Sequence, residues 1–186
     1  MKHIILSLAV AAFFVAGAPA VFAADDTATE TKPAVQVSVF NSGKLTVPAE
    51  FQKVRPRSRI IAHEFSTGEG DQTGRMTMMA SGGGVQPNID RWKGQFTGGE
   101  KENQKVEKHT VGDWTVHIVQ LSGNFAERMG GGPFAPGRTV QRTDWGMLGA
   151  ILEKQGRLYF VKLTGPNDVV KKNRDKFVKM AKGISQ

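Results

Sequence analysis

The sequence predicts an α+β domain, in which a mid-chain helix and a C-terminal helix pack on a mostly antiparallel β-sheet. Three observations lead to this prediction. From residue 35 onward, most apolar residues alternate with polar ones or form short runs, as they do in strands. Short turn-like segments join neighbouring runs, and they force antiparallel pairing because a parallel pair needs a long crossover. Two segments instead repeat apolar residues at helical spacing.

The start of the chain has the pattern of an export signal. A short basic head, Met1 to His3, precedes an apolar stretch from Ile4 to Ala16, and Val21-Phe22-Ala23 fits the small-x-Ala pattern of a cleavage site. We therefore expect residues 1–23 to be a secretory signal peptide. The protein would then be exported to the periplasm or out of the cell.

The alternative for this segment is a retained membrane anchor. Residues 3–24 carry no acidic or strongly basic side chain, and their length would just span a bilayer. Gly17 and Pro19 favour cleavage because they break a helix close to the expected site. After cleavage, we expect no transmembrane segment in the mature chain.

The chain contains no cysteine. It therefore has neither a lipoprotein attachment site nor disulfides, and its stability must come from an ordinary core. Removal of the signal leaves roughly 160 residues, which is enough for one domain. Residues 24–34 are polar and lack periodicity, so we expect a flexible tail there and a single globular domain over residues 35–186.

The protein is basic, with a formal charge of +8 that becomes +7 once Lys2 leaves with the signal. Such a charge suits polyanions, anionic membrane surfaces or acidic partners. Two clusters stand out: Arg55, Arg57 and Arg59 in "RPRSR", and six basic residues between 171 and 182. For the second cluster, a solvated helix face is the favoured interpretation.

The first half of the domain predicts two hairpins. Residues 35–39 alternate and are followed by the turn "NSG" and a short strand at 44–47. Residues 59–66 and 74–80 are two more strand-like runs, joined by the polar segment "TGEGDQTG".

The first helix is predicted from Ile89, Trp92 and Phe96, with Asn88 as its N-cap and Gly98-Gly99 as its stop. It follows the glycine-rich segment "SGGGVQ".

Four strands are predicted after this helix, at 105–111, 114–121, 145–154 and 157–164, with a long glycine- and proline-rich loop over 123–143. Finally, "GPND" is predicted to cap a helix with one apolar face, made of Val169, Val170, Asn173, Phe177, Met180, Ala181 and Ile184.

These segments carry a family resemblance. The strand "RLYFVKLTGP" leading into a helix that ends "FVKMAKGIS" resembles the C-terminal half of the PsbP/DcrB-like fold. The motifs "PRSRIIAHEF", "GGGVQPNIDRWKGQF" and "GPFAPG" are similar to a family of uncharacterised bacterial secreted proteins, over roughly residues 40–186. The resemblance implies an α/β sandwich and a non-enzymatic accessory or binding role. It brings no catalytic residue with it.

The glycines before the first helix do not form a nucleotide site. No Lys-Ser/Thr pair follows them as a P-loop requires, and Pro87 stands where a dinucleotide fingerprint needs glycine. The favoured interpretation is a sharp strand-to-helix turn with positive φ. An anion bound at this helix N-terminus, helped by Arg91, stays open.

The sequence contains no motif typical of a metal site or of a catalytic nucleophile. His63-Glu64 lacks the second histidine of H-E-x-x-H, and no serine lies in G-x-S-x-G. If Gly112-Asp113 forms a two-residue turn, His109 faces Val116, so His109 and His117 point to opposite sheet faces. A register slip of one residue would bring them together, and this alternative stays open. We expect no metal and no cofactor.

Carboxylate pairs are not visible from sequence, since they meet in space rather than along the chain. Glu64, Asp90, Asp144 and Glu153 are eligible, although a solvated or capping role is favoured for each.

A tryptophan groove is the last candidate site. Trp92, Trp114 and Trp145 could line it, with Arg91 and Lys93 beside it and the segment "AERMGGGPFAPGR" as a lid. In the favoured alternative, Trp92 simply anchors the helix on the sheet.

Three functional hypotheses follow. The leading one is an exported, non-enzymatic binding or accessory domain that recognises a protein or an envelope component. The second is a secreted hydrolase with a hidden carboxylate or histidine site, and the third is a protein that binds polyanions or anionic surfaces. We expect no nucleic-acid partner. The candidate binding residues are Arg91, Lys93, Arg55, Arg57 and Arg138, and no catalytic residue is predicted.

Overall fold

The computed structural model describes residues 33–99, 104–130 and 137–185. The predicted signal peptide and nearly all of the predicted tail lie outside these residues. The elements are β1 (Val35–Val39), β2 (Gly43–Val47), β3 (Gln52–Val54), β4 (His63–Thr67), a 3₁₀ turn (Gly70–Gln72), β5 (Gly74–Ser81), α1 (Val85–Lys93), β6 (Phe96–Thr97), β7 (Lys105–Val111), β8 (Trp114–Met129), β9 (Arg138–Lys154), β10 (Arg157–Pro166), α2 (Asn167–Lys172) and α3 (Arg174–Lys182).

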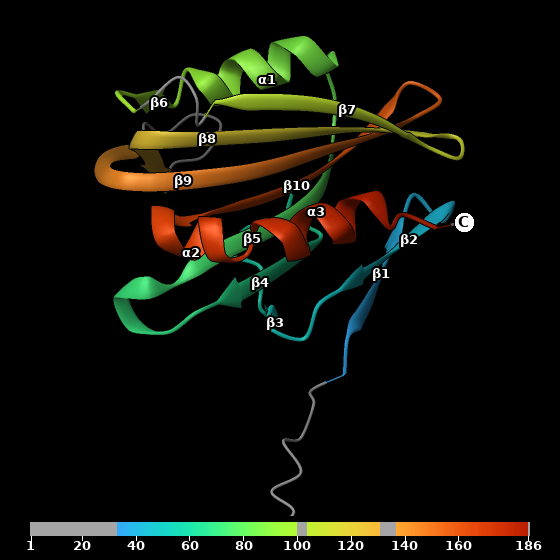
Figure 1. Cartoon of the computed structure of the whole chain (residues 1–186), viewed down its shortest axis with the longest axis horizontal. Coiled ribbons are helices and arrows are strands. Elements are labelled where there is room, and N and C mark those ends of the chain that lie inside the picture. Colours follow the sequence, from blue (N-terminus) through green and yellow to red (C-terminus); the bar gives the residue numbers. More distant parts are fainter. Residues whose placement is uncertain (1–32, 100–103, 131–136, 186) are drawn as a thin grey trace, which may run out of the picture. The chain divides into compact units, whose positions relative to one another are not determined.

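The strands form two antiparallel sheets, which confirms the predicted α+β class (Figure 1). β1 and β2 make a two-stranded sheet. The larger sheet has the order β3-β4-β5-β10-β9-β8-β6, and β7 also pairs with β8. β5 therefore lies beside β10, a strand far away in the sequence.

The large sheet is covered on both faces. α1 lies on one face, and α2 and α3 lie on the other (Figure 1). On β9, Gly149 faces Trp92 of α1, whereas Gly146 faces Val170 of α2. Because successive residues of a strand point to opposite faces, odd and even positions of β9 belong to two different cores. The middle of β9 therefore reads as a continuous apolar run rather than an alternating one.

The register predicted for the hairpin around Gly112-Asp113 is confirmed. In the β7–β8 hairpin, Val111 pairs with Trp114 and His109 pairs with Val116. Gly112 has a φ of 54°, which the tight turn requires. His109 and His117 consequently point to opposite faces of the sheet, and the slipped register is wrong.

The boundaries of the first helix were predicted wrongly. α1 begins at Val85 with Gly84 as N-cap and ends at Lys93, and Phe96 belongs to β6. Pro87 is accommodated in the first helical turn, where backbone N–H groups have no helical partner. Asn88 lies inside the helix, and its Nδ2 donates to the carbonyl oxygens of Gly82 and Gly84 at 3.1 and 2.8 Å.

The predicted turn at the glycines is confirmed at Gly83, which has a φ of 83°. The chain turns there from β5 into α1.

The predicted loop over 123–143 is wrong. β8 and β9 continue as a paired arm, in register from Phe125↔Arg142 to Met129↔Arg138. A register shift between Gly123 and Phe125 separates this arm from the main ladder. The glycines and prolines that predicted a loop over the whole of 123–143 are concentrated at 130–137. Residues 131–136 lie outside the described residues.

Smaller differences concern β3, β4 and the C-terminus. The exposed strand β3 was not predicted, and β4 begins at His63 rather than at residue 59. The single predicted C-terminal helix is two helices, with Pro166 as the N-cap of α2 and a break at Asn173. The predicted apolar face is nevertheless buried as a whole. No helix in the described part of the chain is long and apolar enough to cross a membrane.

Candidate functional site

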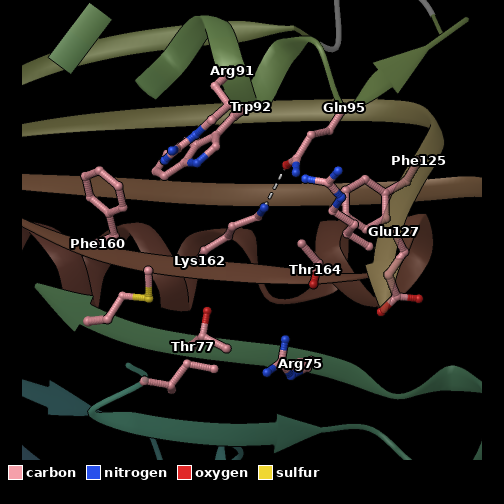
Figure 2. A pocket seen from close by; sticks show the side chains of 13 residues that line it. Arg75, Thr77, Arg91, Trp92, Gln95, Phe125, Glu127, Phe160, Lys162 and Thr164 are labelled. Carbon is pink, nitrogen blue, oxygen red and sulfur yellow. Dashed lines mark hydrogen bonds between the residues drawn. The ribbon is translucent and has the colours of Figure 1, made fainter. Parts of the chain in front are cut away.

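A cavity of about 290 Å³ opens on the sheet face that carries α1. Figure 2 shows side chains from β5, β8, β10 and α1 converging on it. Its lining comprises Ile61, Arg75, Thr77, Met79, Arg91, Trp92, Gln95, Phe125, Glu127, Arg128, Phe160, Lys162 and Thr164.

The floor of the cavity is a ladder of polar pairs. Thr77 of β5 pairs with Lys162 of β10, and Arg75 pairs with Thr164. All four residues are half-buried, while the residues between them are buried in the core on the other face of the sheet. Strand alternation thus places this polar stripe on one face of an otherwise apolar part of the sheet.

Lys162 lies at the centre of the cavity (Figure 2). Its Nζ donates a hydrogen bond of 2.9 Å to Oε1 of Gln95, and it lies 5.9 and 5.6 Å from the ring centroids of Trp92 and Phe125. Within the described residues, no carboxylate forms an ion pair with it. Burial, together with the smaller effects of the Arg91 and Arg75 charges, lowers the pKa of Lys162 to about 8.

The charge of Arg75 is neutralised within the protein by the buried carboxylate of Glu64. Glu64, whose side chain is 1% exposed, accepts hydrogen bonds from Nε and Nη2 of Arg75 at 2.7 and 3.1 Å. The backbone N–H of Arg57 donates to the same carboxylate at 2.9 Å. Burial alone would raise the pKa of Glu64, but these hydrogen bonds and the two arginine charges outweigh it and lower the pKa.

Two further arginines line the cavity without a carboxylate partner in the described structure. Nη2 of Arg91 donates to Oδ1 of Asn88 at 2.5 Å, which orients its guanidinium. Arg128 is exposed at the rim. Glu127 also lines the cavity, but it pairs with Arg142 at 2.9 Å. The cavity therefore has a positive charge in excess.

The rest of the wall is aromatic. The ring of Phe160 meets Trp92 edge-on, with centroids 5.1 Å apart, and Phe125 stands on the opposite side of Lys162 (Figure 2). Trp92 is buried over Gly149, as the favoured interpretation of a helix anchor predicted.

The less favoured alternative, a groove lined by all three tryptophans, is wrong. Trp114 belongs to the core on the other face of the sheet, and Trp145 stacks on Phe125 with centroids 5.8 Å apart. Only Trp92 among the three lines the cavity.

Of the five predicted binding residues, only Arg91 lines the cavity. Lys93, Arg55 and Arg138 are exposed elsewhere on the described surface, and Arg57 is tied to Glu64 with its Nε 3.3 Å from Oε1. Sequence reasoning missed Arg75 and Lys162. A usable signal was present, because each is a lone cation in an apolar strand, within "GRMTMMA" and "LYFVKLTGP".

The other predicted candidates lie apart from the cavity. His117 is 3.5 Å from Glu153, whereas His109 is 3.1 Å from Glu107. Asp90 accepts a hydrogen bond from Gln86, and Asp144 accepts one from Asn167. Across residues 33–99, 104–130 and 137–185, no group of three or more histidine or acidic side chains is placed to hold a metal ion.

A second hollow of about 590 Å³ lies beside α2. Two of its charged groups, Glu50 and Lys176, are bonded to each other. In the C-terminal basic cluster, Arg174 likewise pairs with Glu107 at 3.1 Å. These two ion pairs are matched within the protein, unlike the ammonium group of Lys162 in the α1-side cavity.

No protein-family model and no curated protein matches the sequence. Among solved structures, the chain is similar to the solution structure of cyanobacterial PsbP (CyanoP) from Synechocystis sp. PCC 6803, with a TM-score of 0.50 and 10% sequence identity. The match covers 83% of this chain and 92% of CyanoP. At this identity the likeness concerns the fold, and it confirms the predicted PsbP-like architecture.

Proposed function

We propose that this protein is an exported, non-enzymatic binding or accessory domain that holds its ligand in the cavity beside α1. One observation carries the proposal. The cavity is floored by a half-buried ammonium group, that of Lys162, which has no carboxylate partner among the described residues. Export is supported by the signal-like pattern of residues 1–23.

A cation in this position is not explained by stability. Burying a charge without an ion-pair partner destabilises a fold, and an apolar side chain at the same place would pack better. Residues that are unfavourable for the fold are typical of functional sites. The open cavity in front of Lys162 supplies the space in which a ligand can provide the missing partner.

The lining favours binding over hydrolysis. Its only carboxylate, Glu127, is engaged by Arg142, and neither Thr77 nor Thr164 has a histidine beside it in the described lining. A hydrolase needs an activated nucleophile or a general base next to the reacting atom. Cationic and aromatic groups alone supply recognition instead.

The proposal is tested by amide chemical-shift mapping. We expect a small-molecule extract of the native cell envelope to shift the amide signals of β5, β10 and Gln95. Thr77→Phe, which fills the cavity, should abolish these shifts, whereas Thr110→Phe on the exposed strand β7 should keep them. Shifts confined to other surfaces, or shifts that survive Thr77→Phe, would contradict the proposal.

A further inference from the structure

We propose that the cavity takes a small aromatic monoanion, with a carboxylate on Lys162 and a flat ring against the aromatic wall. This inference rests on the proposed function, since it names the ligand class of the same site.

The charges in and around the cavity favour a ligand with one negative charge. Lys162 faces Arg75 from β5, Arg91 from α1, and Glu127 and Arg128 from β8. Arg75 is offset by Glu64, and Glu127 is offset by Arg142. Of the cations that remain, Lys162 is half-buried, whereas Arg91 and Arg128 are exposed. A single charge at Lys162 therefore restores neutrality inside, with Arg91 at the entrance as a second donor.

The aromatic walls of the cavity favour a ligand whose apolar part is a flat ring. Trp92, Phe125 and Phe160 are each less than a tenth exposed and surround the Lys162 side chain (Figure 2). Rings of this kind favour edge-to-face or offset contacts with another ring. A volume of about 290 Å³ is at the lower end for ligand pockets, so one ring with a short acidic group fits better than a larger molecule.

The protonation of Lys162 agrees with an anionic ligand. Burial and, to a smaller extent, the charges of Arg91 and Arg75 disfavour the ammonium in the empty cavity and lower its pKa, and a carboxylate beside it would favour the ammonium and raise the pKa again. Below a pH of about 8, Lys162 is protonated, so it can pair with an anionic ligand.

Benzoate is the probe for calorimetric titration, with benzyl alcohol as the neutral aromatic control and acetate as the ringless anionic control. We expect a dissociation constant for benzoate on the order of 1 mM or tighter. Each control should bind at least about tenfold more weakly, because it lacks either the charge or the ring. Equal binding of benzyl alcohol would overturn the role of the charge, and equal binding of acetate would overturn the role of the ring.

Variants locate the bound probe. Lys162→Met should weaken benzoate binding about tenfold or more, while Lys162→Arg, which keeps the charge, should retain most of it. Arg91→Ala should weaken binding several-fold, whereas its neighbour Lys93→Ala, which does not line the cavity, should leave it unchanged. Thermal unfolding of each variant verifies that it is folded. An unchanged benzoate affinity in folded Lys162→Met protein would overturn the inference.

Different experimental results would overturn the ligand class inferred here and the proposed function. If benzoate does not bind at all, the inference is overturned, and envelope extract that still shifts the cavity amides would keep the proposed function. If neither benzoate nor extract reaches the cavity, both are overturned.

Discussion

The indole ring of Trp92 lies directly against the backbone of Gly149, so that a Cβ atom at position 149 would overlap the six-membered ring. This contact joins α1 to β9 at the centre of one core. It also sets the height of the helix above the sheet, and thereby the position of the Trp92 edge that lines the cavity. Gly149 is required here for its lack of a side chain.

Gly149→Ala should therefore destabilise the protein by about 3 kcal/mol, since the buried indole cannot move aside without opening the core. Chemical denaturation measures the change. Gly82→Ala is the matched control, because a Cβ there meets no atom within 4 Å, and its effect should stay within about 0.5 kcal/mol. Equal effects of the two substitutions would show that α1 is not held by this contact.

Glu64→Gln should destabilise the protein by about 2 kcal/mol at neutral pH, because it leaves the partly exposed Arg75 without its carboxylate. The exposed pair of Glu50 and Lys176 offers a control, and Glu50→Gln should change stability by about 0.5 kcal/mol or less.

The Glu64 effect should also depend on pH. The pKa of Glu64 is lowered in the folded state, so the stabilisation is fully present above the ordinary carboxyl pKa and is lost as the pH falls through the lower, folded value. Denaturation curves recorded from pH 7 to pH 3 should show the difference between wild type and Glu64→Gln shrinking. A constant difference would contradict the buried ion pair.

Lys162→Met should stabilise the empty protein at pH 7 by about 1 to 3 kcal/mol, because it removes a half-buried charge whose hydrogen-bond partner among the described residues is the neutral amide of Gln95. Between a pH of about 8 and 10.5, the unfolded chain holds the Lys162 proton and the folded protein does not, so wild type gains stability as the pH rises. The two proteins should therefore converge at high pH. Lys179→Met, at an exposed position of α3, should show neither effect.

Export predicts a processed chain. Intact-mass measurement of the protein recovered from its native host should show that it begins near Ala24, after the small-x-Ala pattern. Replacing Ala23 by a bulky residue should block processing, because the peptidase requires a small side chain there. A full-length chain in the membrane fraction of the wild type would instead support the retained anchor.

Local patterns in the sequence were sufficient for much of the fold. The alternation in residues 35–39 and the Gly112-Asp113 turn predicted their hairpins because a short turn determines which residues pair. The prediction failed where two signals conflicted. Glycine and proline content outweighed the strand pattern in 123–143, and Phe96 fitted the helical period of Trp92 although the chain leaves the helix at Gly94.

The cavity was beyond such reasoning because its parts meet only in the folded sheet. The sequence by itself determined the α+β class and favoured the turn that puts His109 and His117 on opposite faces, because both depend on neighbours along the chain. Only the tertiary structure decided that β5 lies beside β10 and that Gln95 reaches Lys162, which is 67 positions away. Long-range pairing depends on how whole faces pack together, and it is this packing that leaves Lys162 facing an open cavity without a counter-charge in the described structure.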